Sequence, residues 1–305
     1  MSVALQALQM LAVIALSILA SAWQPAPGHT QVPIWPTAPQ GPNIENSGKV
    51  DKLVAGRPWT YVNDVSRPTM TVYPPKGQNS GAAVIVFPGG GYQTLAVDLE
   101  GTEVCDWLTA KGMTCVLLKY RVPNRGPSWD QQCGCDVKTK SSKPLEDAQR
   151  TISLVRFHAK EWQIDPHKIG VLGFSAGGHL VAAVSTHFDH RVYSPVDAAD
   201  RESCRPDFAI ALYPGHLFIG HALNPNIRVT HDTPPTFLLQ ARNDPVDDVR
   251  NSEVYGAALK KAKVPVEMHL YDEGGHAFGL RETKLPITRW PRHVETWLKS
   301  IGVLR

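Results

Sequence analysis

The sequence has little cysteine and little net charge. Only 5 of its 305 residues are Cys, no Cys-x-x-Cys pair occurs, and the formal net charge is +3. A zinc site of the usual cysteine spacing is therefore not expected, and the scattered Lys and Arg residues argue against a dedicated nucleic-acid binder. By contrast, 43% of the residues are apolar, and Gly, Pro and His number 24, 25 and 12. This composition predicts a globular chain with a sizeable core and many loops, at whose ends chemistry is expected.

The N-terminal segment is almost continuously apolar from residue 3 to residue 20 and is followed by Ser21 and Ala22. A short apolar core that ends in a small-x-small site predicts an export signal over residues 1–22. The alternative is an uncleaved membrane anchor, because the run approaches the length of a spanning helix. In either case we expect the body of the protein to be secreted or periplasmic. Once a signal is cleaved, no contact with the membrane is expected.

The cysteines fit export loosely. Cys133 and Cys135 lie in a polar loop and are too close to pair easily with each other, so each needs a distant partner such as Cys204. Cys105 and Cys115 lie in apolar segments, where buried thiols are the more common case. Because the number of cysteines is odd, at least one thiol is free or pairs between chains.

Residues 23–67 are rich in Pro and Gly, and we expect edge strands in this segment. After it, apolar runs and helical periodicities alternate along the chain, which predicts one catalytic domain at 68–305. The predicted strands are 69–73, 82–87, 114–119, 168–174, 208–213, 236–240 and 266–271, and the predicted helices lie within 97–111, 145–162, 176–186, 254–262 and 290–301. This alternation predicts an α/β fold with a mostly parallel central sheet and helices on both faces. Asp147 and Arg150 are three residues apart on one predicted helix, which predicts a structural salt bridge between them.

The strongest motif is G-x-S-x-G at residues 173–177, centred on Ser175. It follows a predicted strand and opens a predicted helix, which is the context of a nucleophile elbow. The sharp turn lifts the serine hydroxyl clear of the sheet, and the helix start supplies free N–H groups where an oxyanion would form. We predict that Ser175 is a nucleophile. The alternative is an ordinary Gly-rich turn in which Ser175 caps the helix.

A serine nucleophile of this type is followed in the chain by an acid and then by a histidine. His276 stands in a Gly-rich loop after the predicted strand 266–271 and before the last helix, where a base can reach the elbow. We therefore predict that His276 is the base. The other histidines after Ser175 lie in helices, strand centres or interior loops, where surface or core roles are more common.

The acid is expected in the loop after the predicted strand 236–240. Asp244 comes first in that loop, and Pro245 fixes the turn beyond it. We predict that Asp244 holds the histidine tautomer and stabilises the imidazolium. Asp247 and Asp248 remain the alternatives, from a slightly longer loop.

Three consecutive glycines follow the predicted strand 82–87. Backbone N–H groups at this edge of the sheet, together with the N–H of Ala176, predict an oxyanion hole formed by Gly90, Gly91 and Ala176. A phosphate-binding loop is the alternative, but Lys-Ser/Thr does not follow the glycines. Tyr92 is predicted to line the substrate pocket, with core packing as its alternative role.

These motifs taken together carry a family resemblance over about nine tenths of the chain. They are the stretches 88–92, 119–121, 147–150, 165–166, 169–171, 173–180, 243–246 and 274–279. The chain resembles the α/β-hydrolase esterases near acetylxylan and feruloyl esterases. The resemblance implies the α/β-hydrolase fold, with Ser175 as nucleophile, His276 as base and Asp244 as acid. It also implies that no metal and no organic cofactor take part.

The expected function is that of a secreted serine carboxylesterase. It would remove acetyl or similar small acyl groups from carbohydrate such as acetylated xylan, through a Ser-His-Asp triad and an acyl-enzyme. One alternative is a dipeptidyl-peptidase-like serine hydrolase, which usually needs an additional domain or an acidic clamp for the substrate amine. The other is an inactive hydrolase-fold protein that binds carbohydrate.

Overall fold

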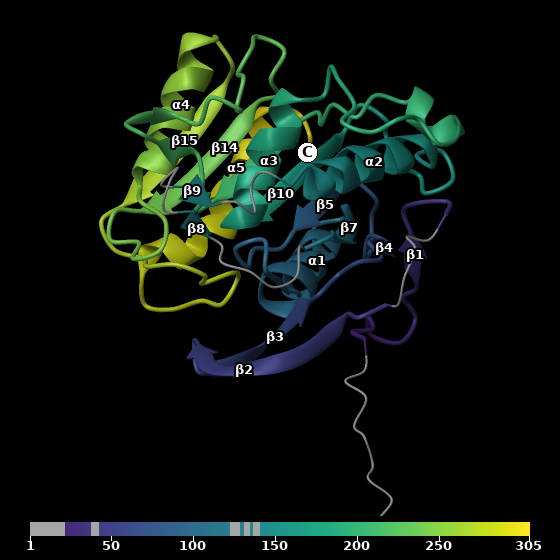
Figure 1. Cartoon of the computed structure of the whole chain (residues 1–305), viewed down its shortest axis with the longest axis horizontal. Helices are drawn as coiled ribbons and strands as arrows, with labels where there is room; N and C mark the ends of the chain where they lie inside the picture. Colours follow the sequence, from purple (N-terminus) through teal and green to yellow (C-terminus); the bar gives the residue numbers. More distant parts are fainter. Residues whose placement is uncertain (1–21, 38–42, 123–128, 131–134, 137–140) are drawn as a thin grey trace, which may run out of the picture.

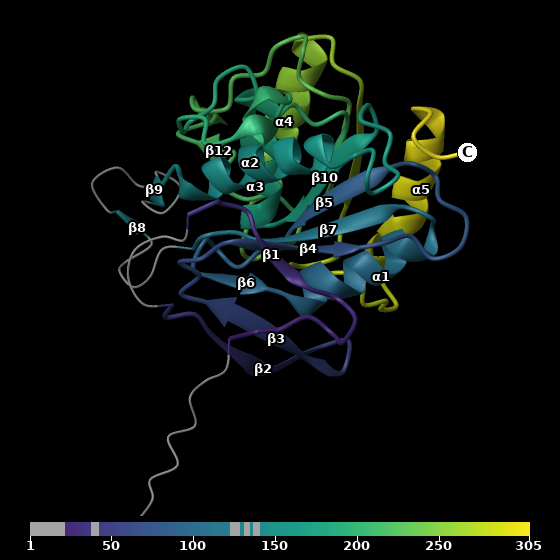
Figure 2. The same cartoon turned by 90° about the vertical axis from the view of Figure 1, so that its right-hand side faces the viewer.

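One mostly parallel sheet of eight strands runs through the described part of the chain (Figures 1 and 2). The computed structural model describes residues 22–37, 43–122, 129–130, 135–136 and 141–305. In order across the sheet, the strands are β1 (Gln31–Pro33), β4 (Thr69–Tyr73), β7 (Thr114–Lys119), β5 (Ala83–Phe87), β10 (Ile169–Phe174), β11 (Ala209–Leu212), β14 (Thr236–Ala241) and β15 (Val266–Tyr271). The pairs β1–β4 and β4–β7 are antiparallel, and the other pairs are parallel.

Helices cover both faces of this sheet. They are α1 (Glu103–Ala110), α2 (Lys143–Phe157), α3 (Ala176–Thr186), α4 (Arg250–Lys261) and α5 (Trp290–Ser300). Figure 2 shows α2, α3 and α4 on one side of the sheet and α1 and α5 on the other. Every residue of β5, β7, β10, β11 and β14 is buried, which is why these strands are continuous apolar runs in the sequence. The predicted α/β architecture is confirmed.

The helix predicted over 97–111 begins later than expected. The N–H of Thr102 bonds to the carbonyl of Val97, five residues back, and this forms a π-helical turn, η1 (Asp98–Thr102), before α1. The Asp98 carboxylate accepts the N–H groups of Leu99 and of Thr60. These side-chain bonds bind the turn to a neighbouring strand, so the chain does not enter the α-helix until Glu103.

The segment 23–67 contributes to two sheets. Its strand β1 lies at the edge of the central sheet, as predicted for an edge strand. The strands β2 (Asn46–Val54) and β3 (Arg57–Asn63) instead form a separate antiparallel sheet with β6 (Thr94–Ala96), and all three are labelled in the lower part of Figure 2. Two further strand pairs are short: β8 (Trp129–Asp130) with β9 (Cys135–Asp136), and β12 (Phe218–Ile219) with β13 (Ala222–Leu223). The division of the chain near residue 67 stays a prediction.

The export signal predicted over residues 1–22 lies almost wholly outside the described residues, which begin at Ala22. Among the residues that are described, no helix has the length and apolar character needed to cross a bilayer.

The cysteine predictions were wrong in two respects. Cys105 of α1 and Cys115 of β7 form a disulfide, with their Cα atoms 5.2 Å apart. The helix ends at Ala110 and the chain returns directly into the adjacent strand, so two buried side chains of successive elements face each other. Cys204 is a buried free thiol and donates to the carbonyl of Phe188, so it is not the partner of a loop cysteine.

The predicted salt bridge between Asp147 and Arg150 is also wrong. Asp147 instead accepts from Arg121, at 3.0 Å, and from the indole N–H of Trp35, at 2.8 Å. Arg150 is 2% exposed and points toward a different segment, the one around Asp197. Each of these two buried charges has a partner of opposite sign elsewhere in the chain, and such partners outweigh a pairing along the helix surface.

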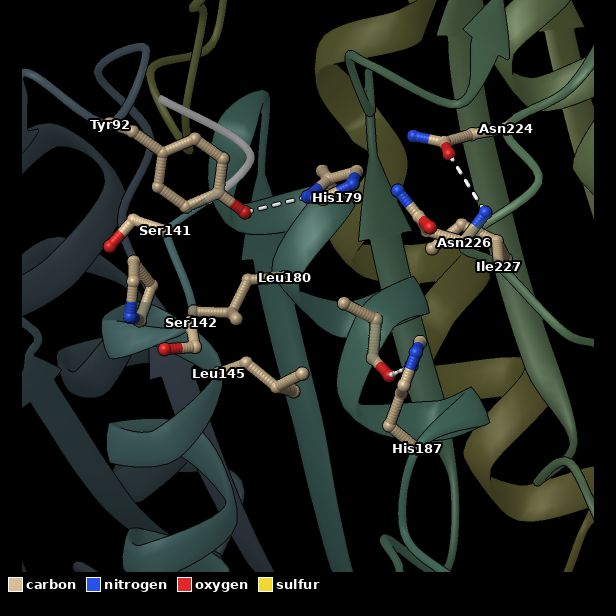
Figure 3. A pocket seen from close by; sticks show the side chains of 12 residues that line it. Tyr92, Ser141, Ser142, Leu145, His179, Leu180, His187, Asn224, Asn226 and Ile227 are labelled. Carbon is tan, nitrogen blue, oxygen red and sulfur yellow. Dashed lines mark hydrogen bonds between the residues drawn. The ribbon is translucent and has the colours of Figure 1, made fainter. Parts of the chain in front are cut away.

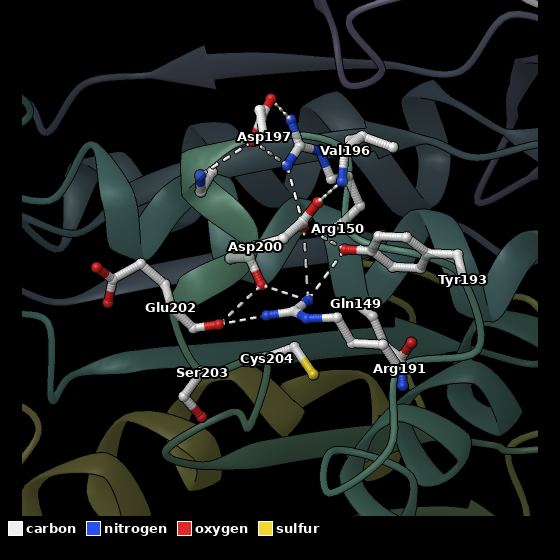
Figure 4. Close-up of polar contacts among 12 residues, drawn as sticks. Gln149, Arg150, Arg191, Tyr193, Val196, Asp197, Asp200, Glu202, Ser203 and Cys204 are labelled. Carbon is white, nitrogen blue, oxygen red and sulfur yellow. Dashed lines mark hydrogen bonds and ion pairs between the residues drawn. The ribbon is translucent and has the colours of Figure 1, made fainter.

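The Arg150 side chain fixes three segments to each other (Figure 4). Its guanidinium pairs with both carboxylate oxygens of Asp197 and lies 3.0 Å from the carboxylate of Asp200, whose side chain is fully buried. Its Nε donates to the carbonyl of Ile34 at 2.8 Å. Tyr193 donates its hydroxyl to Asp200 at 2.6 Å and completes the network.

Replacing this cation tests the network. In Arg150→Met the buried Asp200 carboxylate loses its closest cation, and we expect the free energy of unfolding to fall by about 3 kcal/mol. Urea unfolding followed by circular dichroism measures the change. Lys76→Met is the matched control, because its ion pair with Asp106 is exposed and is expected to contribute nothing measurable. Equal losses in both variants would contradict the role given to Arg150.

Candidate active site

Ser175 occupies a strained turn between the end of β10 and the start of α3. Its φ is 51° and its ψ is −119°, a conformation that residues other than glycine rarely adopt. The two glycines of the motif are required by packing. A Cβ added at Gly173 would lie 2.2 Å from the carbonyl oxygen of Gly177, and one added at Gly177 would lie 2.0 Å from that of Phe87. The turn therefore has the geometry predicted for a nucleophile elbow.

The structure brings the three residues predicted as a triad into one line of hydrogen bonds. His276 Nε2 lies 3.0 Å from Ser175 Oγ, and His276 Nδ1 lies 2.8 Å from Asp244 Oδ2. The Asp244 side chain is fully buried, and that of His276 is 10% exposed. The acid follows β14 and the histidine follows β15, so parallel strands deliver both side chains to the same edge of the sheet as Ser175.

The alternative acids lie elsewhere around the histidine. Asp247 is on the other side of the imidazole, 3.7 Å from Nε2, and accepts a hydrogen bond from Ser175 Oγ at 3.3 Å. Asp248 pairs with Arg250 at the surface. Asp244 is thus the carboxylate placed against Nδ1, where an orienting acid must act.

The loop predicted to form an oxyanion hole lies against the elbow. A Cβ at Gly89 would lie 2.7 Å from the carbonyl oxygen of Phe174 and 2.9 Å from Ser175 Cβ. The N–H of Gly89 is already used, because it donates to Glu100 Oε2 at 2.8 Å. Gly90 and Gly91, both at positive φ, are the next residues along the loop.

Ala176 completes the predicted oxyanion hole from the opposite side of the turn. It is the first residue of α3, a position at which the helix itself does not use the backbone N–H. That Ala176, Gly90 and Gly91 donate to an oxyanion stays a prediction.

Tyr92 is buried, with 2% of its surface exposed, and forms a wall of a cavity of about 260 Å³ next to α3 (Figure 3). Its hydroxyl lies 2.7 Å from Nδ1 of His179, which is one helical turn beyond Ser175. The cavity is also lined by Ser141, Ser142, Pro144, Leu145, Leu180, Ala183, His187, Asn224, Asn226 and Ile227. Tyr92 thus lines this cavity, and its ring also packs edge-on against Tyr120. That Tyr92 contacts a substrate stays a prediction.

The polar wall of this cavity carries no charge at His179. Burial, together with the smaller effects of His216 and His187, lowers the pKa of His179 to about 3. A neutral imidazole and a phenol hydroxyl therefore face the cavity at this point. Such groups orient a ligand by hydrogen bonding and do not attract it by charge.

Glu100 is a member of the site that the sequence analysis missed. Its carboxylate is buried, accepts the N–H of Gly89 at 2.8 Å, and accepts the hydroxyl of Tyr213 at 2.9 Å. Tyr213 in turn accepts the N–H of Gly279 at 3.1 Å, and its ring lies edge-on to that of His276 at 4.9 Å. Glu100 therefore connects the glycine loop after β5 with the histidine loop. The available signal was a pair of acidic residues, Asp98 and Glu100, within an otherwise apolar stretch at 95–101.

Opposing effects set the charge of these groups. Burial raises the pKa of Glu100, while the hydroxyl of Tyr213, the charge of His276 and the N–H of Gly89 act against this increase. Burial lowers the pKa of His276, but the hydrogen bond and charge of Asp244, with the charges of Asp247 and Glu100, outweigh burial. The pKa of His276 consequently lies above its ordinary value of 6.5. In the described part of the chain, no cluster of three or more His, Cys, Asp or Glu side chains is arranged to hold a metal ion.

A strained serine at a strand-to-helix turn, joined to a histidine and an aspartate that follow later strands of one parallel sheet, defines an α/β hydrolase. Comparison with known proteins agrees with this class. Residues 70–214 match the family model BD-FAE. The α/β hydrolase MGS-M1 from a deep-sea metagenome library has the same fold, with a TM-score of 0.59 and 24% identity over 84% of this chain and 98% of its own.

A bifunctional acetyl ester-xyloside hydrolase from Caldicellulosiruptor lactoaceticus is more similar, with 32% identity and a TM-score of 0.70 over 90% of this chain and 97% of its own. An acetylxylan esterase from Xylanibacter ruminicola is 29% identical over 253 residues, which are 79% of this chain and 50% of that protein. The chain thus spans half the length of this curated relative. The chain belongs to the α/β-hydrolase carbohydrate esterase family, and the resemblance found in its motifs is confirmed.

The charges around His276 determine the pH at which it can act as a base. A protonated imidazole cannot accept the proton of Ser175, so kcat/KM for an uncharged ester is expected to fall as the pH falls, with a midpoint above 6.5. The variant Asp244→Asn loses the charged carboxylate that raises the pKa of His276 most, so this pKa is expected to decrease. Proton NMR titration of the imidazole signals measures the pKa of His276 in the wild type and in Asp244→Asn, with the other histidines as internal controls. An unchanged His276 titration in this variant would contradict the assignment of Asp244.

Glu100→Gln tests the connection between the two loops. An amide has one acceptor and one donor, so in either orientation its N–H₂ group faces the N–H of Gly89 or the hydroxyl of Tyr213. We expect the free energy of unfolding to fall by about 1–3 kcal/mol and kcat for ester hydrolysis to decrease, because a buried donor loses its acceptor. Urea unfolding and steady-state kinetics provide the measurements. The exposed Glu161→Gln is the control, and wild-type behaviour of Glu100→Gln would rule out the connection.

Proposed function

We propose that this protein is a serine carboxylesterase that removes acetyl or similar small acyl groups from carbohydrate. The observation that carries the proposal is the continuous hydrogen-bonded line from Ser175 through His276 to the buried Asp244, next to a glycine loop. An acylated sugar of the kind found in acetylated xylan is the proposed substrate. No cofactor takes part in the proposed reaction.

In the first half of the reaction, Ser175 Oγ attacks the ester carbonyl carbon while His276 Nε2 takes the hydroxyl proton. The N–H groups of Gly90, Gly91 and Ala176 stabilise the oxyanion that forms. The carbon–oxygen bond to the sugar then breaks, and the sugar oxygen takes the proton from His276. The acyl group remains on Ser175 as an ester.

In the second half, water replaces the sugar. His276 takes a proton from the water as its oxygen attacks the acyl carbon, and the carboxylic acid leaves as Ser175 recovers its proton. Throughout both halves, Asp244 holds Nδ1 of the imidazole and stabilises the imidazolium. Its full burial keeps this bond out of competition with solvent.

A neutral, hydroxyl-rich substrate is supported by two findings. The walls of the cavity beside α3 include the amides of Asn224 and Asn226 and the hydroxyl of Tyr92, which both donate and accept hydrogen bonds. His179 on the same wall is held neutral by burial. The proteins to which the chain is similar include an acetylxylan esterase and an acetyl ester-xyloside hydrolase.

Export remains part of the proposal. The apolar segment at residues 1–22 predicts it, and the disulfide between Cys105 and Cys115 supports it, because such bonds persist mainly in oxidising compartments. Secretion or transfer to the periplasm would bring the enzyme to polymeric substrates that do not enter the cell.

Removing the nucleophile tests the mechanism. Ser175→Ala is expected to lower kcat for p-nitrophenyl acetate by at least about 10⁴-fold, because no other group can form the acyl-enzyme. Ser300→Ala, at the exposed end of α5, is the control and is expected to keep wild-type activity. Equal turnover by wild type and Ser175→Ala would show that the proposed mechanism is wrong.

The substrate class is tested with a second panel. Rates are compared for acetate, butyrate and feruloyl esters, and acetate release is measured from acetylated xylan alongside cleavage of a short peptide. The proposal expects the acetate esters and xylan to be hydrolysed and the peptide to remain intact. Efficient cleavage of the peptide alone would instead support a peptidase.

A further inference from the structure

A second carboxylate touches the nucleophile, and the proposed mechanism has no use for it. Asp247 Oδ2 lies 3.3 Å from Ser175 Oγ and 3.7 Å from His276 Nε2, and its side chain is 14% exposed. Ser175 has one hydroxyl proton, which both Asp247 and His276 are placed to accept. For a plain ester this arrangement is unfavourable, since the proton must go to the histidine and a negative charge stands beside the reacting centre.

The position of Asp247 is fixed from several sides. Its backbone N–H donates to Asp244 Oδ1 at 3.0 Å, and its carbonyl accepts from the buried side chain of Gln240 at 2.7 Å. Gln240 is itself held by the hydroxyl of Ser252 at 2.6 Å. The carboxylate lies directly over Gly215, where an added Cβ would come within 2.5 Å of Asp247 Oδ1. Asp247 is therefore held in a fixed position beside the nucleophile and is part of the site.

The strand order tells which part of a substrate this carboxylate would face. The glycine loop follows β5, on one side of β10 and Ser175, whereas Gly215 and Asp247 follow β11 and β14, on the other side. The carbonyl oxygen of an ester bound for attack points to the glycine loop. The alcohol oxygen must lie near His276 Nε2, which protonates it, and Asp247 is close to the same nitrogen. Asp247 therefore stands on the alcohol side.

An ionised carboxylate only accepts hydrogen bonds, so the matching group on the substrate is a donor. In a sugar ester, the donor nearest the ester oxygen is the hydroxyl on the neighbouring carbon. We propose that Asp247 recognises this free neighbouring hydroxyl, and that the enzyme therefore prefers sugars acylated at one position and unacylated at the next. This inference rests on the proposed esterase function and extends it to the alcohol part of the substrate.

The proposal is tested with a matched pair of substrates. One is methyl β-xyloside acetylated at the 3-hydroxyl, and the other is the same compound with the 2- and 4-hydroxyls methylated. Wild type is expected to prefer the free-hydroxyl compound by roughly ten- to hundredfold in kcat/KM, the discrimination typical of a hydrogen bond to a charged group. In Asp247→Ala this ratio is expected to fall toward 1, while hydrolysis of p-nitrophenyl acetate rises.

Asp248→Ala is the matched control, since Asp248 pairs with Arg250 at the surface and does not face the site. It is expected to keep the wild-type ratio. An unchanged ratio in Asp247→Ala would overturn the proposal. So would a parallel loss of activity on p-nitrophenyl acetate and the sugar esters, because Asp247 would then position the nucleophile and not the substrate.

Binding measurements separate this proposal from the esterase function itself. In a Ser175→Ala background, calorimetry gives the Kd of both xylosides without hydrolysis. If Ser175→Ala binds the free-hydroxyl compound more tightly than the methylated one, and Ser175→Ala/Asp247→Ala does not, the proposal is supported even if the protein hydrolyses no ester. If the free-hydroxyl compound has the same Kd in both variants, the proposal is overturned. Binding of alanine p-nitroanilide that is tighter than that of either xyloside and depends on Asp247 would assign the carboxylate to an ammonium group and would also overturn it.

Discussion

The site depends on one tight contact, the approach of the first turn of α3 to the end of β5. Gly177 lies against the carbonyl oxygens of Phe87 and Pro88 with no room for a side chain. This contact fixes β10 and α3 relative to the neighbouring strand and holds Ser175 at a positive φ that it would not adopt alone. The glycine loop that continues from β5 is positioned by the same contact, so Ser175 and the glycine loop share one support.

Around this support, three carboxylates surround one histidine with different tasks. Asp244 binds the imidazole directly and Glu100 joins two loops behind it, while Asp247 contacts Ser175 on the other side of the ring. All three raise the pKa of His276, against the effect of burial. His179 on the cavity wall stays neutral, whereas the negative charge of the carboxylates is concentrated around His276. This division agrees with the neutral sugar ester that we propose as the substrate.

The sequence predicted what depends on local pattern and missed what depends on distant partners. Both the buried strands and the elbow could be located, because buried strands are continuous apolar runs and the elbow requires glycines at fixed spacing. The strands of the central sheet from β4 to β15 lie within one residue of their predicted bounds. Asp244 and Asp247 are three residues apart in one loop, and only the backbone turn decides which reaches Nδ1. The partners of Glu100 are 11 and 113 residues away, which no local pattern reveals. The partners of Arg150, 47 and 116 residues away, were missed for the same reason. The two cysteines of the disulfide are only 10 residues apart, and there it was the return of the chain from α1 into the adjacent strand that the pattern did not reveal.

The buried carboxylate of Glu100 has a consequence for variation within this fold. Because it accepts donors from the glycine loop and, through Tyr213, from the histidine loop, neither loop can change its course alone without exposing a buried charge or a donor. The glycine loop and the histidine loop are therefore expected to vary together in sequence. Grafting the glycine loop into another hydrolase, or recombining the two halves of related genes between these loops, would succeed only where this acid and the tyrosine travel with it.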